Sequence, residues 1–226
     1  MTIQQMFLST EYTPFSLTFI TSSGTTAATS AWTPPALAEV GDLEILFHFG
    51  WDNDSEFLDN ADIPSGVGFQ SVYTNTGSVS GSTANYLSVI VTRRVLTDKV
   101  AQTFVNPGLD GRGFVGMYWR PSKPIASYTL STVNFQSITG NPTSQSVTAS
   151  SGVAPLIVFG AASSDVGTGA FSTQTPAFDG TQSMTGIAPR GIVGWTTYNS
   201  SPADHTIDMN DLGSNMLMSF YLSVSG

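Results

Sequence analysis

The sequence of 226 residues contains no cysteine, so disulfide bonds and thiolate metal sites are excluded. Charged residues are also scarce, at 10% of the chain, whereas soluble domains typically carry about 25%. Ser, Thr, Asn, Gln and Gly take the place of charge at the positions that face solvent. Such a composition is typical of secreted or virion β-proteins, whose surfaces are hydrated by hydroxyls and amides. An acidic β-domain of another origin is the alternative.

Basic residues are much scarcer than acidic residues. Seven Lys and Arg face sixteen Asp and Glu, which gives a net charge of −9. Nucleic-acid binding draws most of its affinity from cations on phosphates, and anionic membrane surfaces attract basic segments. We therefore expect neither nucleic acid nor a membrane as a partner. Neutral glycans, other proteins and further copies of the same chain are the partners that this charge favours.

Long apolar runs are missing as well. No stretch approaches the roughly 20 apolar residues that a membrane span requires. Residues 1–10 hold no basic residue and no sustained apolar core, so a secretory signal is not expected. A surface of extracellular type without an export signal predicts assembly in a cytoplasm and release by cell lysis.

No window sustains a helical stripe of apolar residues, and short apolar runs of strand length recur instead. The clearest is Leu43–Phe49 after Gly41-Asp42, and Leu156–Gly160 after Pro155 repeats its pattern. Runs of this kind suit buried strands of one sheet packed on another. We expect a long polar loop over Gly167–Gly186. The expected strands are Ser16–Ile20, Leu43–Phe49, Phe69–Thr74, Tyr86–Leu96, Thr103–Val105, Gly113–Trp119, Tyr128–Val133, Ser146–Ala149, Leu156–Ala161, Ile192–Thr197, His205–Met209 and Met216–Val224.

This spacing predicts an all-β fold, a single antiparallel β-sandwich of about ten to twelve strands. No linker or shift in composition divides the chain, so one domain over residues 1–226 is expected. The nearly continuous apolar run at the C-terminal end is expected to close the core beside the N-terminal half.

An acidic loop offers the strongest candidate for a metal site. Asp52, Asp54 and Glu56 place carboxylates at alternate positions, which is how a loop surrounds Ca²⁺. Phe57 stands at the sixth position of this loop, where an EF-hand requires Gly. A solvated acidic loop tip is therefore the alternative. No other cofactor is expected.

Catalytic chemistry has little support. His48 and His205 are the only imidazoles that could act as bases, and no Gly-x-Ser-x-Gly nucleophile elbow is present. We expect His48 to be a core histidine, because it lies inside an apolar run. Paired carboxylates for a polysaccharide hydrolase stay open, since their separation depends on the fold. The prediction is that the protein is not an enzyme.

Four tryptophans could serve as stacking platforms for sugars. Each also lies beside or within an expected strand, where burial is the usual outcome. We assign Trp119 and Trp195 to the core and keep Trp32 and Trp51 as candidates for glycan binding.

The order of several short motifs resembles a jelly-roll-like β-sandwich domain of tailed-bacteriophage virion proteins and bacterial surface proteins. In that family a Gly-Asp-Leu strand is followed by a variable loop and a Pro-Ser-Gly turn. Gly41-Asp42-Leu43 and Pro64-Ser65-Gly66 match these two motifs, and Met216–Val224 resembles the closing strand. Gly68-Phe69 departs from the pattern, because a Trp is usual there.

The resemblance implies a bacteriophage virion structural protein: a surface-exposed fibre, tail-associated or capsid-decorating subunit that acts by binding and assembly. It would be assembled in the host cytoplasm and carried on the extracellular particle. Its expected partners are other virion proteins and copies of itself, a trimer among the options, with residues 1–15 as an arm contacting a neighbouring subunit. The alternative function is a carbohydrate-binding module for a host-receptor glycan, with Ca²⁺ in the acidic loop.

Overall fold

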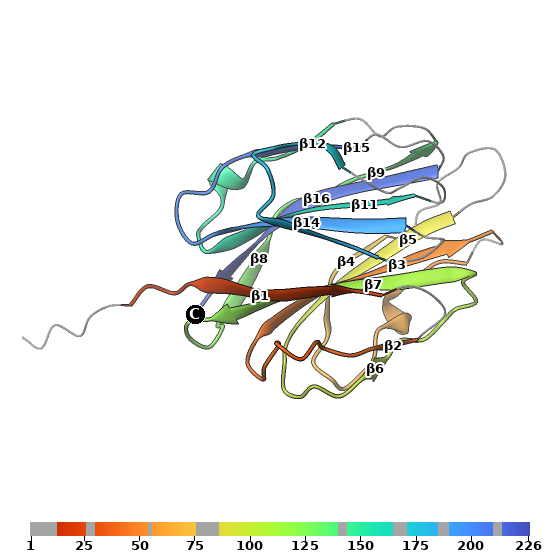
Figure 1. Ribbon diagram of the computed structural model, residues 1–226, viewed down its shortest axis with the longest axis horizontal. Helices are drawn as coiled ribbons and strands as arrows, with labels where there is room; N and C mark the ends of the chain where they lie inside the picture. The colour runs from red at the N-terminus through yellow and green to blue at the C-terminus, as the bar shows by residue number, and fades with distance from the viewer. Residues whose placement is uncertain are drawn as a thin grey trace, which may run out of the picture.

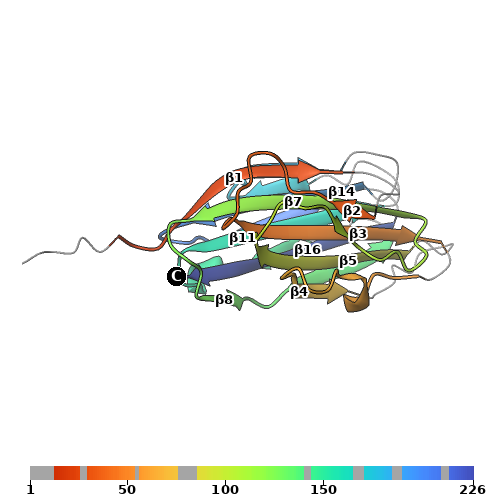
Figure 2. The same ribbon diagram turned by 90° about the horizontal axis from the view of Figure 1, so that it is seen from below.

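Two antiparallel sheets pack face to face, and each is built from one half of the chain (Figure 1). The computed structural model describes residues 13–25, 30–53, 56–75, 86–139, 144–164, 171–184, 190–209 and 214–226. The N-terminal sheet has the order β1-β7-β3-β5-β4, and the C-terminal sheet the order β13-β14-β11-β16-β8, with β9 also paired to β16. Figure 2 shows the strands of both sheets running along the long axis of the molecule.

The strand bounds of the N-terminal sheet are β1 (Leu17–Gly24), β3 (Leu43–Asp52), β4 (Gln70–Asn75), β5 (Tyr86–Val95) and β7 (Gly111–Pro121). Those of the C-terminal sheet are β8 (Ser127–Leu130), β9 (Asn134–Thr139), β11 (Leu156–Ser164), β13 (Gly180–Ser183), β14 (Arg190–Tyr198) and β16 (Ser214–Ser225).

One hydrophobic core fills the space between the two sheets. Because side chains alternate along a strand, every second residue of β3 faces inward, as Phe47 does. The Phe47 ring lies 5.7 Å from that of Phe159 and 6.2 Å from that of Phe220, measured between centroids. Trp119 and Trp195 meet edge to face in the same core, which confirms the prediction that both are buried.

The outer face of each sheet is covered as well. A ribbon of β2 (Ala31–Trp32) and β6 (Gln102–Thr103) covers the N-terminal sheet, and Trp32 and Phe104, which follows β6, belong to a second apolar cluster there. A small sheet of β10 (Gln145–Val147), β15 (His205–Met209) and β12 (Phe171–Thr175) belongs to a third cluster on the C-terminal sheet. Strands buried on both faces read as continuous apolar runs, which is why β3 and β11 dominate the sequence pattern.

The two halves of the chain repeat one strand order. The N-terminal half reads β1-β7-β3-β5-β4 across its sheet, and the C-terminal half reads β8/β9-β16-β11-β14-β13. In each half the second strand pairs with the sixth as an outer cover, β2 with β6 and β10 with β15. β12 is the addition that distinguishes the second half.

The long edges of the sandwich are blunted. β1 and β4 each contain a register shift, between Phe19 and Thr21 and between Ser71 and Tyr73. β1 also meets the opposite sheet, where Ser22 Oγ donates to Gln182 Oε1 at 2.9 Å. Tyr73 of β4 meets Phe135 of β9, with ring centroids 6.1 Å apart. Bulges and covered edges oppose strand addition by another chain.

The predicted antiparallel β-sandwich is confirmed, and the jelly-roll connectivity stays a prediction. The described residues form sixteen strands, more than the ten to twelve expected, because β2, β9, β12 and β13 are short or mainly polar and were not predicted. Their only helical turns are the 3₁₀ turns η1 (Asn60–Asp62) and η2 (Ala149–Ser151). The loop expected over Gly167–Gly186 is wrong in part, because β12 and β13 lie in it. In the part of the chain that the structure describes, no helix is long and apolar enough to span a membrane.

Candidate functional site

The acidic loop after β3 uses its first carboxylate to hold its own backbone. Asp52 is buried, with 2% of its surface exposed. Its Oδ1 accepts the backbone N–H of Glu56 at 3.3 Å, and its Oδ2 accepts that of Asp110 at 3.3 Å. Both oxygens therefore tie together two segments of backbone, which is a structural role.

Two later acidic residues, Asp59 and Asp62, cap the 3₁₀ turn η1. Asp59 accepts the N–H of Ala61 at 2.6 Å, and Asp62 accepts the N–H of Asp59 at 2.8 Å. This reciprocal capping box satisfies donors at the start of the turn. Burial raises the pKa of Asp62, although Arg112 opposes that shift. These carboxylates also serve the backbone of the loop.

The calcium prediction gains no support from this arrangement. Glu56 is exposed, Asp52 is buried, and Asp54 lies outside the described residues. Within the described ranges, no three His, Asp or Glu side chains gather as metal ligands would. The site at Asp52, Asp54 and Glu56 stays a prediction.

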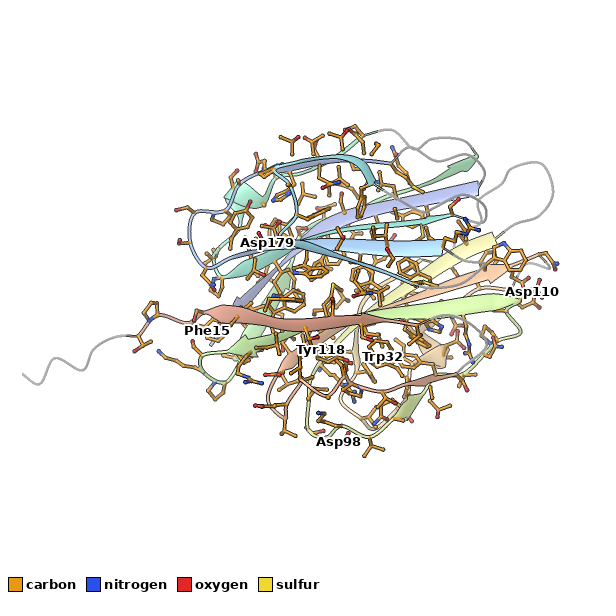
Figure 3. The ribbon with its side chains drawn as sticks, viewed as in Figure 1. Phe15, Trp32, Asp98, Asp110, Tyr118 and Asp179 are labelled. Atoms are coloured by element: carbon orange, nitrogen blue, oxygen red, sulfur yellow. The ribbon has the colours of Figure 1, made fainter. Side chains whose placement is uncertain are left out.

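Trp32 anchors the β2–β6 ribbon to the N-terminal sheet through a buried polar network. Its Nε1 donates to Glu44 Oε1 at 2.6 Å and to the Tyr118 hydroxyl at 2.9 Å. Figure 3 shows Trp32 and Tyr118 side by side beneath the sheet. Tyr118 O–H and Arg94 Nε also donate to the Glu44 carboxylate. Burial and the Glu44 charge raise the pKa of Tyr118.

The structure gives no support to glycan binding by Trp32, which the sequence offered as a candidate. Its side chain is 1% exposed, and its N–H is committed to Glu44 and Tyr118, so its ring offers no face to a sugar. Trp51 is half-buried at the end of β3 and packs against the central core. Its indole nitrogen is enclosed without a hydrogen-bond partner. Glycan binding by Trp51 stays a prediction.

Both histidines lie in the interior. His48 stacks on Phe114 with 4.3 Å between ring centroids, as expected of a core histidine. Burial, aided by the charge of Arg112, lowers the pKa of His48 to about 3. His205 lies 2.9 Å from the Tyr198 hydroxyl, and burial lowers its pKa too. Each residue is 1% exposed, so neither ring presents a base to a substrate in solution.

An apolar surface lies at the end of the sandwich where β3 and β11 begin and β5, β7 and β14 end. We call it the apolar end. Large hydrophobic side chains are exposed there in loops far apart in the sequence, and Val153 is 78% exposed. Four of the seven such side chains among the described residues belong to it: Leu37, Val40, Val95 and Val153. Exposed clusters of this kind mark interaction surfaces more often than isolated apolar residues do.

Two hollows deepen the apolar end. One, of about 590 Å³, lies between Gly41, Val95 and the Pro121–Ile125 turn. The other, of about 400 Å³, is bordered by Phe15, Val153 and the C-terminal residues of β16. Phe15 marks this end of the molecule in Figure 3, and Asp110 lies at the opposite end. Lys123 is exposed in the Pro121–Ile125 turn of the apolar end.

The sequence predictions did not include the apolar end, because its members come from separate segments that the fold brings together. The available signal was weak: Leu37, Val40 and Val153 are single aliphatic residues inside loops.

Comparison with known proteins gives no relative for this chain: no family model, curated protein or solved structure matches it.

Proposed function

We propose that the protein is a structural subunit of a tailed-bacteriophage particle, attached through the apolar end to another particle protein. The single observation that carries the proposal is the concentration of exposed Leu and Val side chains at that end. The phage assignment itself rests on the motif resemblance and on the uncharged, hydroxyl-rich composition. The subunit acts by burying the surface of its apolar end against that partner.

The blunted edges support attachment by the end. A sandwich can assemble by adding strands at its edges or by burying a side-chain surface. The register shifts in β1 and β4 and the contact of Tyr73 with Phe135 oppose the first route. Side-chain packing at the apolar end is the route that remains.

The charge at this end supports a partner with an apolar surface. Arg120 is neutralised by Glu39 and Asp42, with N–O distances of 2.9 Å to each carboxylate. The chain is acidic overall, yet this pairing leaves no strong field of one sign around the exposed valines. A complementary apolar patch on the partner would therefore supply the contact.

The proposal is tested by a variant that charges the surface without disturbing the fold. Val40→Asp combined with Val153→Asp alters side chains that are 65% and 78% exposed, so the free protein is expected to fold normally. Phage grown with only this variant should lack the protein in purified particles, as read by mass spectrometry.

The matched control is Val105→Asp, which charges an exposed valine over the outer face of the N-terminal sheet. It should be incorporated like the unchanged protein. Absence of the unchanged protein from purified particles would exclude a structural role, and normal incorporation of the double variant would exclude attachment by the apolar end.

A further inference from the structure

A shallow groove runs along the edge of the C-terminal sheet, where the strand edge is interrupted between β8 and β9. Two hollows of about 300 and 460 Å³ adjoin there and share Asn134 and Ser146 in their walls. One wall is the segment around Ser131–Asn134, and the other is β10. Neither hollow shares a residue with those of the apolar end.

The groove is polar and uncharged. Hydroxyl and amide side chains dominate its lining, and no Asp, Glu, Lys, Arg or His contributes to either hollow. An ionic ligand would be desolvated there without a counter-charge. Hydroxyls and amides can each donate and accept hydrogen bonds, which suits a ligand that is itself rich in hydroxyls.

Hydrogen bonds hold the walls in place. Asn134 Nδ2 donates to the carbonyl of Ser146 at 2.6 Å and so joins one wall to the other. Ser131 Oγ accepts the backbone N–H of Tyr221 at 2.8 Å, and the Ser131 N–H donates to the Tyr221 carbonyl at 3.0 Å. A groove fixed in this way costs less ordering free energy when a ligand binds.

Aromatic surface borders the polar lining. Tyr221 of β16 is half-buried and lines the smaller hollow. A Cβ placed on Gly152 would lie 3.0 Å from the Tyr221 ring, so close backbone packing fixes one side of this ring. Aromatic carbons beside hydroxyls match the alternation of C–H faces and hydroxyls on a sugar ring.

We propose that this groove binds a neutral saccharide. The proposal is independent of the assembly role, because it concerns a different surface. The two are compatible: a subunit held by the apolar end would leave this edge of the sandwich uncovered. Recognition would depend on hydrogen bonds from side chains such as Thr132 and Thr148 and on contact with Tyr221.

The probes are neutral tetrasaccharides of glucose, galactose and mannose, with a sulfated tetrasaccharide as the charged comparison. Titration into the isotope-labelled full chain should shift backbone amide signals of residues 131–136 and 144–151 for at least one neutral sugar. The sulfated sugar should bind more weakly. A chelator should leave binding unchanged, which separates this groove from a calcium-dependent site at the acidic loop.

Ser146→Trp tests the location, because Ser146 is exposed and lines both hollows. The indole should fill the groove and weaken binding at least tenfold. Thr173→Trp is the matched control: Thr173 is exposed on β12 of the same small sheet and lines neither hollow, so its affinity should equal that of the unchanged chain.

No shift with any neutral sugar would overturn the proposal, as would equal affinities for Ser146→Trp and the unchanged chain. Stronger binding of the sulfated sugar would overturn it too. None of these results bears on incorporation into particles, so the assembly role stands or fails separately.

Discussion

Glu44 is the buried side chain that connects the outer ribbon to the N-terminal sheet. It is fully buried, and its carboxylate accepts hydrogen bonds from Trp32, Tyr118 and Arg94. The Arg94 guanidinium also lies 4.2 Å from the centroid of the Phe69 ring. A buried charge is tolerated when several hydrogen-bond donors satisfy it. Removing one of these donors therefore leaves part of the desolvation cost of the carboxylate uncompensated.

Trp32→Phe removes the indole N–H and keeps an aromatic ring. We expect the free energy of unfolding to fall by about 2 kcal/mol, because hydrogen bonds to charged groups contribute about 1.5–3 kcal/mol. Urea unfolding measures the change. Trp195→Phe is the control, since it removes a similar ring from the central core without breaking a hydrogen bond to Glu44. An equal loss in both variants would show that volume, rather than the network, sets the cost.

His48 makes stability depend on pH. Its pKa in the folded protein is about 3 because of burial, whereas an unfolded histidine titrates near 6.5. Between these values the unfolded chain binds a proton that the folded chain excludes, so stability falls as the pH decreases from about 6.5 toward 3. At pH 5 this loss amounts to about 2 kcal/mol.

His48→Phe should remove that part of the pH dependence, because Phe fits between Phe104 and Phe114 and does not titrate. Urea unfolding at pH 7 and pH 5 gives the loss for each protein. The loss should be smaller in the variant by about 2 kcal/mol. Burial of His205, whose pKa is also lowered, leaves a residual slope. An equal loss of unfolding free energy between pH 7 and pH 5 in both proteins would contradict the assignment of this pH dependence to His48.

At the scale of elements, β7 and the β2–β6 ribbon fit together through a glycine. A Cβ placed on Gly116 would lie 2.2 Å from the Trp32 ring, which is closer than any real contact. Gly116→Ala should therefore lift the ribbon from the sheet and destabilise the fold by about 1–3 kcal/mol. Ser23→Ala, at the position paired with Gly116 on β1, should change stability by less than about 0.5 kcal/mol.

Limited proteolysis reports the ribbon directly. The Gly116→Ala variant should be cut faster within residues 33–41 than the unchanged protein, while Ser23→Ala should be cut at the same rate. Equal rates in all three proteins would mean that the ribbon does not depend on this close approach.

The sequence predicted the strongly apolar elements and missed the polar ones. Leu43–Phe49 and Leu156–Ala161 identified β3 and β11, because strands buried on both faces carry an unmistakable run of apolar residues. β12 (Phe171–Thr175) and β13 (Gly180–Ser183) were not predicted, because they are exposed outer or edge strands that contain mainly polar residues. Their pairing with β15 and β14 supplies the backbone hydrogen bonds that composition does not reveal.

The candidate sites were harder to predict than the fold. Trp32 lies in a Thr- and Pro-rich loop, which suggests exposure; only its contact with Glu44, twelve residues away, shows that it is buried. Carboxylates at alternate positions of the loop sequence are typical of a metal site. In the structure, however, the carboxylates of Asp52 and Asp62 accept hydrogen bonds from backbone amides. The apolar end and the neutral groove depend on long-range contacts that no local pattern encodes.

For the whole molecule, the repeated strand order means that each half supplies one wall of a shared core. The inner face of the N-terminal sheet, with Phe47 and Trp119, is covered by Phe159, Trp195 and Phe220 of the other half. Neither sheet has a second partner for this face, and a sheet with an exposed apolar face is not stable alone.

Residues 13–125 and 126–226, expressed separately, should therefore fail to fold. Each fragment should lack dispersed amide signals and bind a hydrophobic dye, whereas mixing them should restore the spectrum of the intact protein. Cooperative unfolding of either fragment alone would contradict the shared core and would instead indicate two independent domains.

The most direct test of the central claim is cross-linking mass spectrometry on purified particles. Of the only two lysines, Lys123 lines a hollow of the apolar end, whereas Lys99 follows Asp98, which Figure 3 places below the middle of the N-terminal sheet. A lysine-reactive cross-linker therefore reports on the apolar end through Lys123. The account predicts cross-links from Lys123 to one other particle protein. Particles that contain the protein with Lys123 accessible to a small amine-reactive label, and without such cross-links, would contradict it.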